Sequence, residues 1–510
     1  MLLSSILRNL QENEAFAGAQ VLGQPESEME INGINYDSRK VKPGDIFVAI
    51  SGDASDGHNY MGQALRKGAV AFLLERPLPE FPNTPQIITR DSRRAMAALA
   101  ALWWDHPDRK LRLTGVTGTN GKTTTVNMLH WIWQYQGEKS GLIGTINNQI
   151  AGRQIPSSLT TPESCELFAL LRQMVSEGCT RAAMEVSSHG LKQGRVAGCN
   201  FAGVIFTNLT QDHLDFHRTW GDYLNSKLEL LRLLAKSAAS DKYSVINIDD
   251  PSAGEFLALA RGDIWTYGTA QKARLRLLDY SLSSLGTVFD LRYRKQGAKE
   301  QIYSIKIPLI GRFNIYNALA AIAAALAEGF EIGEVIQALA AMPQVPGRFE
   351  LLDEGQDFTV AVDYAHSPDG LQKILATARE MNPRRLICVF GCGGDRDRTK
   401  RPIMGRIAGE NSDFAIITSD NPRSEEPEAI VREVESGVQE TAARYLVQVN
   451  RRDAIESAIA MAKPGDILLI AGKGHEDYQL VKGRVLPFDD RETARHYLRE
   501  RAKKQFIMHN

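Results

Sequence analysis

Short hydrophobic runs separated by turn-forming residues mark the N-terminal part of the chain. The segment INYDSRKVKPGDIFVAISG alternates apolar and polar positions around a KPGD turn, and QALRKGAVAFLLE changes from helical to strand spacing. A proline-rich stretch, ERPLPEFPNTPQ, precedes an alanine-rich helix, SRRAMAALAALWWDH. These patterns predict a small α/β domain over residues 1–98, with its boundary inside that helix.

The hydrophobic runs of the next part alternate with helical stretches. AAMEVSS, AGVIFTNL and YSVINID have the apolar character of strands that are buried on both faces. RLLDYSLSSLGTVFDLRYRK and QIYSIKIPL are expected to add antiparallel strands, and NIYNALAAIAAALAEGF predicts a long helix. Residues 99–343 are therefore predicted to form a central domain, a doubly wound, mostly parallel sheet with helices on both faces.

The segment MPQVPG separates this domain from a further alternation of strands and helices. FTVAVDYAH, RLICVFGCGG, DFAIITSDNP and DILLIAGKG each predict a strand that ends in a loop. Residues 344–510 are predicted to form a Rossmann-like C-terminal α/β domain, in which ligands bind at the loops after the strands. The chain is thus assigned to the α/β class with three domains.

Composition and charge exclude several classes of function. The 510-residue chain is 43% hydrophobic, and its 60 Lys and Arg residues balance 61 Asp and Glu residues. This balance gives no overall electrostatic case for nucleic acid or an anionic membrane as a partner. The five cysteines lack paired CxxC spacing, which argues against a disulfide framework and a zinc site. With no basic leader and no run of membrane-spanning length, we expect a cytoplasmic protein without membrane insertion.

A glycine-rich loop follows the strand LRLTGVT and opens the helix TTVNMLHWIW. The loop consists of Gly118, Thr119, Asn120, Gly121, Lys122, Thr123 and Thr124. In this order of strand, loop and helix, backbone N–H groups surround phosphates, the lysine reaches the outer phosphates and the next threonine reaches Mg²⁺. Val116 stands where the standard pattern has a glycine, so this is a variant P-loop. It predicts ATP or GTP binding, and the alternative is a glycine-rich turn with a solvated lysine.

Two further strands end in acidic and histidine residues. Glu185 lies in MEVSSHG, where a carboxylate at a strand end can bind Mg²⁺ directly or through water. His213 lies in TQDHLDFH after the next strand and could bind a metal or orient a phosphate. The alternatives are a loop carboxylate in a salt bridge and a structural histidine.

Lys227 lies in the helical segment DYLNSKLELLRLLAK, within a stripe of leucines at helical spacing. Such a lysine either points inward or extends past the stripe to solvent. Periodicity alone favours the second arrangement.

Taken together, these motifs resemble the Mur ligase family, ATP-dependent enzymes that build the stem peptide of peptidoglycan. The resemblance also rests on TTP at 160–162, GRFN at 311–314, PGRFE at 346–350 and VDYAHSP at 362–368. It implies that Lys227 is carbamylated and holds Mg²⁺ together with Thr123, Glu185 and His213. It implies catalytic roles for Lys122, Lys227, Glu185 and His213, and ATP contacts from Asn314, Arg348 and Asp363. We expect a monomer.

The resemblance also implies a site for a UDP-muramoyl substrate. In the first domain it includes Tyr36 and Ser38, near the uracil, and Asp53, Ala54 and Ser55. In the central domain it includes Thr160, Thr161, Ser187, Gln193 and Arg195. Leu159 departs from related sequences that have an asparagine before the two threonines, which puts that contact in doubt.

The third-domain loops GCGGDRDR and DNPR resemble the amino-acid site of the family member that adds meso-diaminopimelate. The implied contacts are Arg396, Asp420, Asn421, Pro422, Arg423, Gly472 and Glu476. Taken alone, Arg396 could instead form an ion pair with Asp395 or Asp397, and DNPR could be an ordinary proline turn.

The implied reaction is ATP-dependent formation of an amide between meso-diaminopimelate and the D-glutamate carboxylate of UDP-N-acetylmuramoyl-L-alanyl-D-glutamate, through an acyl phosphate. The alternatives are a lysine-adding relative, an enzyme like folylpolyglutamate synthase, and a P-loop switch or scaffold that ligates nothing.

Overall fold

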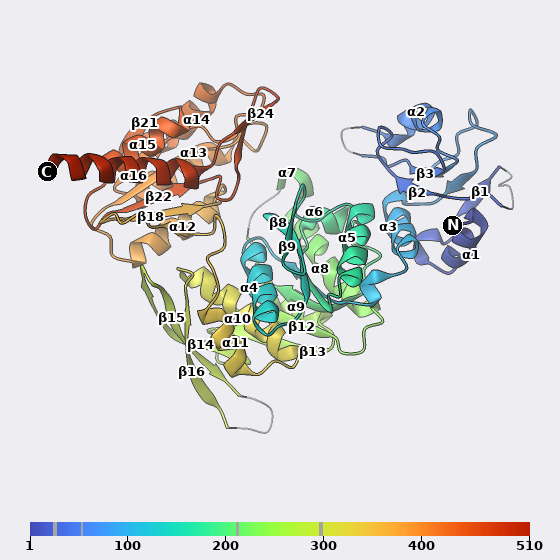
Figure 1. The fold of residues 1–510 in the computed structure, drawn as a ribbon, viewed down its shortest axis with the longest axis horizontal. Coiled ribbons are helices and arrows are strands. Elements are labelled where there is room, and N and C mark those ends of the chain that lie inside the picture. The colour runs from blue at the N-terminus through green and yellow to red at the C-terminus, as the bar shows by residue number, and fades with distance from the viewer. Residues whose placement is uncertain (24–27, 53–54, 211–213, 295–298, 510) are drawn as a thin grey trace.

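The computed structural model describes residues 1–510 except 24–27, 53–54, 211–213, 295–298 and 510. Three sheets follow one another along the chain, and each is covered by its own helices (Figure 1). The predicted α/β class with three domains is confirmed. None of the described helices combines the length and the apolar character needed to cross a membrane.

The first sheet has five strands in the order β1-β5-β4-β3-β2. β1 pairs antiparallel with β5, and the other pairs are parallel. Its elements are α1 (Leu3–Leu10), β1 (Gln20–Leu22), β2 (Gly33–Asn35), β3 (Asp45–Val48), α2 (Met61–Arg66), β4 (Ala71–Leu74), β5 (Gln86–Ile88) and α3 (Ser92–Trp103). Helix α3 begins at Asp91, whose carboxylate accepts a hydrogen bond from the Arg94 amide at 3.0 Å. The boundary at residue 98 lies inside this helix and stays a prediction.

The central sheet has eleven strands in the order β16-β15-β14-β13-β12-β11-β6-β10-β7-β8-β9. Its strands are β6 (Arg112–Thr117), β7 (Ser140–Ile143), β8 (Asn147–Ile150), β9 (Arg153–Pro156), β10 (Arg181–Glu185), β11 (Phe201–Phe206), β12 (Tyr243–Asn247), β13 (Asp263–Gly268), β14 (Leu275–Ser283), β15 (Gly286–Tyr293) and β16 (Gln301–Ile307). The pairs from β7 to β14 across the centre are parallel, and antiparallel strands extend both edges. The antiparallel strands β14 to β16 were predicted, whereas the β8 and β9 hairpin was not.

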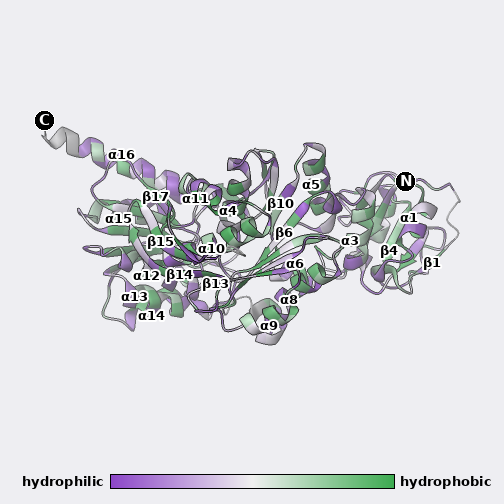
Figure 2. Cartoon of the chain, turned by 90° about the horizontal axis from the view of Figure 1, so that it is seen from below, coloured by the Kyte–Doolittle hydropathy of each residue, from purple (hydrophilic) through white to green (hydrophobic). Residues whose placement is uncertain are grey.

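Helices cover both faces of this sheet, as predicted for a doubly wound domain. They are α4 (Lys122–Tyr135), α5 (Ser164–Ser176), α6 (Ser188–Lys192), α7 (Leu214–His217), α8 (Trp220–Lys236), α9 (Ala253–Leu259), α10 (Arg312–Ala327) and α11 (Ile332–Ala340). Buried side chains of α4, α10 and α11 form one core, and those of α5, α8 and α9 form the other. Figure 2 shows β6 between α4 and α8.

The third sheet has six strands in the order β17-β18-β22-β19-β20-β21, and β17 is the antiparallel edge. Its elements are β17 (Glu350–Leu352), β18 (Thr359–Asp363), α12 (Pro368–Glu380), β19 (Leu386–Phe390), α13 (Lys400–Asn411), β20 (Phe414–Ile417), α14 (Pro427–Gln439), β21 (Arg444–Val447), α15 (Arg451–Met461), β22 (Ile467–Ala471) and α16 (Asp490–His509), with a separate hairpin of β23 (Tyr478–Val481) and β24 (Arg484–Pro487). Helices α12, α13 and α14 pack on one face, and α15 and α16 pack on the other. The boundary at residue 343 falls between α11 and β17 and stays a prediction.

A buried ion pair fixes two loops at the carboxyl end of this third sheet. The Arg451 guanidinium donates to both carboxylate oxygens of Asp490, at 2.7 and 2.6 Å, and neither side chain is exposed. The same guanidinium donates to the carbonyl oxygens of Ser419, at 3.4 Å, and Ala471, at 2.9 Å. These carbonyls directly precede Asp420 and Gly472, so the ion pair joins the loops that carry them.

Replacing Asp490 should therefore destabilise the third domain strongly. Asp490→Ala leaves the Arg451 charge buried without its partner, which costs about 3–5 kcal/mol. Urea denaturation should show a lower midpoint for the third-domain transition than in the wild-type protein. Glu500→Ala, which removes an exposed partner of Lys503, is the control and should leave the midpoint unchanged. Equal midpoints for Asp490→Ala and the wild-type protein would contradict this role of the ion pair.

Candidate active site

The P-loop connects the end of β6 to the start of α4 and lies at the centre of the large sheet. The Lys122 ammonium folds back on the loop and donates to the carbonyl oxygens of Gly118, at 2.8 Å, and Thr119, at 2.9 Å. Gly118 has φ 150°, and a Cβ there would lie 1.9 Å from the Thr207 hydroxyl. The backbone can approach its neighbour this closely only because the residue is a glycine.

Side chains from neighbouring helices and from the loop after β11 surround the P-loop. The Thr119 hydroxyl lies 2.9 Å from the Tyr223 hydroxyl, and Asn208 accepts a hydrogen bond from the Asn120 amide at 3.0 Å. Gly121 has φ 87°, and a Cβ there would lie 2.3 Å from the Asn317 amide oxygen. Thr124, the last residue of the predicted loop, is buried in the first turn of α4.

Glu185 ends β10 beside the P-loop and is almost completely buried. Its carboxylate accepts hydrogen bonds from the Thr123 hydroxyl at 2.9 Å and from the Thr145 amide and hydroxyl at 2.7 and 3.1 Å. These donors are neutral, so they satisfy the oxygens without cancelling the charge. A buried carboxylate next to a P-loop threonine matches the hard oxygen ligands that Mg²⁺ prefers. His213, the histidine predicted to act here, lies outside the described residues.

Lys227 points inward from α8, and only 1% of it is exposed. The alternative in which it extends to solvent is therefore wrong. Its ammonium donates to the Gly118 carbonyl at 2.8 Å and lies 4.6 Å from the centre of the Tyr223 ring. The carbonyl of Gly118 thus accepts from both Lys122 and Lys227.

The residues predicted to contact ATP come from two domains. The buried Asn314 amide lies at the start of α10 and is bonded to the Ile310 carbonyl at 2.8 Å. Arg348 reaches the P-loop and donates to the Thr123 hydroxyl at 2.9 Å. The Asp363 carboxylate accepts from the amides of Phe349 and Ala365, both at 2.7 Å. Burial raises the pKa of Asp363 above its ordinary value.

The central-domain residues predicted to bind the muramoyl group form one cluster. The Thr161 hydroxyl lies 3.0 Å from the Ser187 hydroxyl, and Arg195 donates to the Thr161 carbonyl at 2.8 Å. Arg195 also donates to the Gln193 side chain at 2.6 Å. Thr160 accepts from the Thr145 hydroxyl at 3.0 Å, which links the cluster to Glu185.

The first domain meets this cluster through helix α5. The Tyr36 hydroxyl donates to Glu166 at 2.8 Å, and Arg195 pairs with Glu163 at 3.0 Å. Among the described residues, Ser38 and Ser55 have no such contact with the cluster. Ser38 bonds Gln63, Ser55 is exposed, and Asp53 and Ala54 lie outside the described residues. Leu159, the departure from related sequences, is 41% exposed.

A cleft of about 920 Å³ lies between the central and third domains. Six of the predicted amino-acid contacts line it, namely Arg396, Asp420, Asn421, Arg423, Gly472 and Glu476. Pro422 is buried beside them, and His189 and Thr210 line the central-domain side. The cleft therefore brings the third-domain loops next to the strand ends of the P-loop domain.

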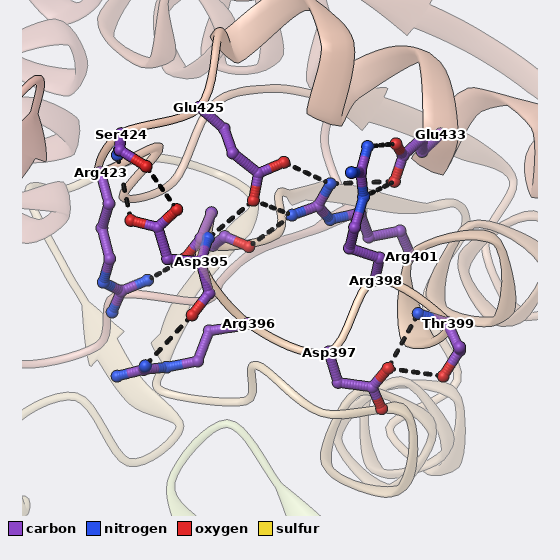
Figure 3. Close-up of polar contacts among 12 residues, drawn as sticks. Asp395, Arg396, Asp397, Arg398, Thr399, Arg401, Arg423, Ser424, Glu425 and Glu433 are labelled. Carbon is purple, nitrogen blue, oxygen red and sulfur yellow. Dashed lines mark hydrogen bonds and ion pairs between the residues drawn. The ribbon is translucent and has the colours of Figure 1, made fainter. Parts of the chain in front are cut away.

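Hydrogen bonds between the polar groups of the cleft hold them in place. Asn421 donates to the Glu476 carboxylate at 2.8 Å, and one oxygen of the buried Asp420 carboxylate accepts from the Asn421 amide at 2.6 Å. Arg396 donates to the carbonyl of Asp395 at 3.3 Å (Figure 3). The carboxylates of Asp395 and Asp397 instead accept from Ser424 and Thr399, so the alternative of an Arg396 ion pair is wrong among the described contacts.

Asp369 is a cleft residue that the sequence analysis missed. It lies in the first turn of α12 and accepts from the Asn120 side chain at 2.8 Å and from the Thr210 hydroxyl at 3.1 Å. The hydrogen bonds of Asp369 and Arg348 connect the third domain to the P-loop. Its place directly after the VDYAHSP motif was the available signal, but the partner lies 249 residues away in sequence.

Family models match all three parts of the chain. The one described as Mur ligase family, catalytic domain, matches residues 30–104. The Mur ligase middle domain matches residues 116–325, and the Mur ligase, glutamate ligase domain, matches residues 347–474. The chain belongs to the Mur ligase family.

Curated relatives match nearly the full length of the chain. A protein of Syntrophomonas wolfei subsp. wolfei, named UDP-N-acetylmuramoyl-L-alanyl-D-glutamate--2,6-diaminopimelate ligase, is 48% identical over 93% of this chain and 96% of its own. A protein of the same name from Bacillus licheniformis is 43% identical over 98% of this chain and 100% of its own.

Solved structures have the same fold. A structure of a ligase with that name has a TM-score of 0.67 and 33% identity and covers 94% of this chain and 96% of its own. The Thermotoga maritima MurF ligase in complex with ADP has a TM-score of 0.60 and 18% identity, and covers 94% of this chain and 99% of its own. At 18% identity, the MurF structure shows only that the fold is similar.

Removing the Asp369 carboxylate should loosen the contact between the third domain and the P-loop. In Asp369→Ala, amides of residues 118–123 should exchange hydrogen about threefold to tenfold faster, because two bonds to a charged group are lost. Hydrogen exchange with mass spectrometry measures this. Lys373→Ala removes a neighbour that pairs with Asp369 at 2.7 Å and is the control, which should exchange like the wild-type protein. Unchanged exchange in Asp369→Ala would contradict the contact.

Proposed function

We propose that the chain is an ATP-dependent ligase that joins meso-diaminopimelate to the D-glutamate carboxylate of UDP-N-acetylmuramoyl-L-alanyl-D-glutamate, with release of ADP and phosphate. This product is a peptidoglycan precursor. The observation that carries the proposal is the single cleft shared by Arg396 and Arg423 of the third domain and by Thr210, which bonds to the P-loop. The names of relatives that are 43–48% identical support the same substrates.

The chemistry requires activation of the carboxylate. An amine and a carboxylate do not condense at neutral pH, so an oxygen of the D-glutamate carboxylate first attacks the γ-phosphorus of ATP. ADP leaves, and an acyl phosphate remains. The amine of meso-diaminopimelate then attacks the carbonyl carbon, the tetrahedral intermediate loses phosphate, and the amide forms with loss of a proton from nitrogen.

The P-loop is proposed to bind the ATP phosphates. The N-terminus of the 14-residue helix α4 points its amides at that position, and the Lys122 ammonium lies within reach. Lys122 would leave the loop carbonyls and offset negative charge between the two reacting anions. Asn314, Arg348 and Asp363 are proposed to contact the rest of the nucleotide. The bond from Arg348 to Thr123 supports a site that closes over ATP.

Thr123, Glu185, His213 and a carbamylated Lys227 are proposed to hold Mg²⁺. When bound, the metal would neutralise phosphate charge. The contact between the Thr123 hydroxyl and the buried Glu185 carboxylate fits such a ligand set. Carbamylation, the addition of carbon dioxide to the neutral amine with loss of a proton, would convert Lys227 into an anion whose two oxygens can bind the metal ion.

The UDP-muramoyl substrate is proposed to span the first and central domains. Tyr36, Ser38, Asp53, Ala54 and Ser55 would bind its nucleotide end. Thr160, Thr161, Ser187, Gln193 and Arg195 would bind the muramoyl peptide. The hydrogen bond from the Thr161 hydroxyl to the Glu185 carbonyl at 3.0 Å supports placing the peptide end of the substrate in the central domain. It puts the peptide-binding cluster beside the proposed metal ligands.

Meso-diaminopimelate is proposed to bind in the third-domain part of the cleft. It differs from lysine by one carboxylate at the far end of the side chain, and a guanidinium can bind that group through two parallel N–H bonds. Arg423 would supply that guanidinium, with Arg396 beside it. Asp420, Asn421 and Glu476 would bind the neighbouring ammonium, while Pro422 and Gly472 shape the backbone around it.

Cytoplasmic location and a monomeric state remain predictions.

A coupled assay tests both the activity and the selectivity. With ATP and the UDP-muramoyl dipeptide, the wild-type enzyme should release phosphate with meso-diaminopimelate and be at least about a hundredfold less efficient with lysine, because lysine leaves Arg423 unpaired. Arg423→Ala should raise the KM for meso-diaminopimelate and leave the KM for the dipeptide unchanged. It should also reduce the preference for meso-diaminopimelate over lysine. Equal use of both amino acids by the wild-type enzyme would contradict the assignment.

Substitutions of Lys122 and Lys227 should impair ligation in different ways. Lys122→Ala should weaken ATP binding, as measured by calorimetry, and abolish ligation. Lys227→Ala should also abolish ligation but bind ATP normally, and a small added carboxylate should restore part of its activity by replacing the carbamate oxygens. Carbon-13 bicarbonate should label a carbamate in the wild-type protein and not in Lys227→Ala. The absence of that signal from the wild-type protein would exclude the carbamate.

A further inference from the structure

A buried arginine outside the predicted site connects the loops that carry Arg396 and Arg423. Arg401, on α13, has a side chain with no exposed surface. It donates to the Glu425 carboxylate at 2.7 and 2.9 Å, to Glu433 at 2.9 Å and to the Gly393 carbonyl at 3.3 Å (Figure 3). One guanidinium therefore contacts the loop after β19, the loop after β20 and helix α14.

Glu425 extends this network to Asp395, which lies in the loop after β19. One oxygen that accepts from Arg401 also accepts from the Asp395 amide at 2.7 Å. In the opposite direction, the Asp395 carboxylate accepts from the Ser424 hydroxyl at 2.6 Å and from its amide at 3.1 Å. The hydrogen bond from the Arg401 guanidinium lowers the pKa of Glu425 to about 2, so the carboxylate stays charged at neutral pH.

The position of Arg423 depends on the same two loops. Its guanidinium donates to the Gly394 carbonyl at 2.7 Å, and the Gly394 amide donates to the Asn421 carbonyl at 2.9 Å. The backbone of Arg423 has φ 54°, a left-handed conformation that is unfavourable for a residue with a side chain. A hydrogen bond from its amide to the Leu480 carbonyl at 2.9 Å helps to hold it there.

The network also determines which charges remain available in the cleft. Glu425 and Glu433 pair with Arg401, and Glu433 pairs with Arg398 as well. The carboxylate of Asp395 is taken up by Ser424, and that of Asp397 by Thr399. In the described part of the chain, no ion pair within 4.0 Å involves Arg396 or Arg423. Both cleft arginines therefore keep their charge for an incoming carboxylate.

We propose that Arg401 and Glu425 are positioning residues that determine selectivity for the amino acid. They hold the loops after β19 and β20 in the positions at which Arg396 and Arg423 face one carboxylate of meso-diaminopimelate. Pairing with Arg401 also keeps nearby acidic side chains away from those two arginines. This inference rests on the proposed function. Neither Arg401 nor Glu425 is among the residues that line the cleft.

Glu425→Gln tests the proposal with Glu433→Gln as a matched control. Both changes remove one carboxylate that pairs with Arg401, but only Glu425 also accepts from the Asp395 amide. Glu425→Gln should raise the KM for meso-diaminopimelate about tenfold and narrow the preference over lysine, while kcat and the KM values for ATP and the dipeptide change less than about twofold. Glu433→Gln should change the KM for meso-diaminopimelate by less than about threefold.

Arg401→Lys gives an independent readout, because it keeps the buried charge but cannot reproduce the two bonds that separate guanidinium nitrogens donate to the two oxygens of Glu425. It should raise the same KM, with the KM for ATP again unchanged. Equal KM values for meso-diaminopimelate in Glu425→Gln, Arg401→Lys and the wild-type enzyme would overturn the inference. So would a parallel rise in all three KM values, which indicates general loosening of the fold. If the wild-type enzyme released no phosphate with any diamino acid, the proposed function and this inference would both be wrong.

Discussion

The contact between the third domain and the P-loop is the interaction on which the active site depends. Arg348 bonds to Thr123, and Asp369 bonds to Asn120, so side chains of one domain complete the phosphate-binding loop of another. Without these bonds, the P-loop and the arginines of the third-domain loops would belong to separate surfaces. These bonds place the P-loop and the cleft arginines next to one another, as the proposed attack of an amine on an activated carboxylate requires.

The P-loop and the cleft next to it carry different charges, and each suits a different part of the proposed reaction. At the P-loop, the Gly118 carbonyl accepts from Lys122 and Lys227, and the buried Glu185 lies beside Thr123. In the third domain, Glu425 and Glu433 are paired with Arg401, and Arg396 and Arg423 line the cleft. The P-loop suits phosphate and a metal ion, and the cleft arginines suit a carboxylate of the amino acid.

Features encoded within a short segment could be predicted from the sequence, and contacts between distant segments could not. The P-loop, the strand-end Glu185 and the parallel sheets follow from local patterns of glycine, charge and hydrophobicity. Burial of Lys227 could not be decided from helical spacing, because a lysine within an apolar stripe can either point inward or extend its ammonium past the stripe to solvent. Asp369 and Arg401 were missed because their partners lie in other helices and loops. The β8 and β9 hairpin was missed because its strands, NNQI and RQIP, are mostly polar and have no apolar alternation in sequence.

The central claim is that the carboxylate of the UDP-muramoyl dipeptide is activated by phosphorylation inside the interdomain cleft. Oxygen-18 placed in the D-glutamate carboxylate tests this most directly, with mass analysis of the phosphate released in the presence of ATP and meso-diaminopimelate. The acyl phosphate loses its bridging oxygen to phosphate when the amine attacks, so each phosphate should carry one labelled oxygen from a fully labelled carboxylate. Phosphate without label, released at the same rate as the amide forms, would contradict the account.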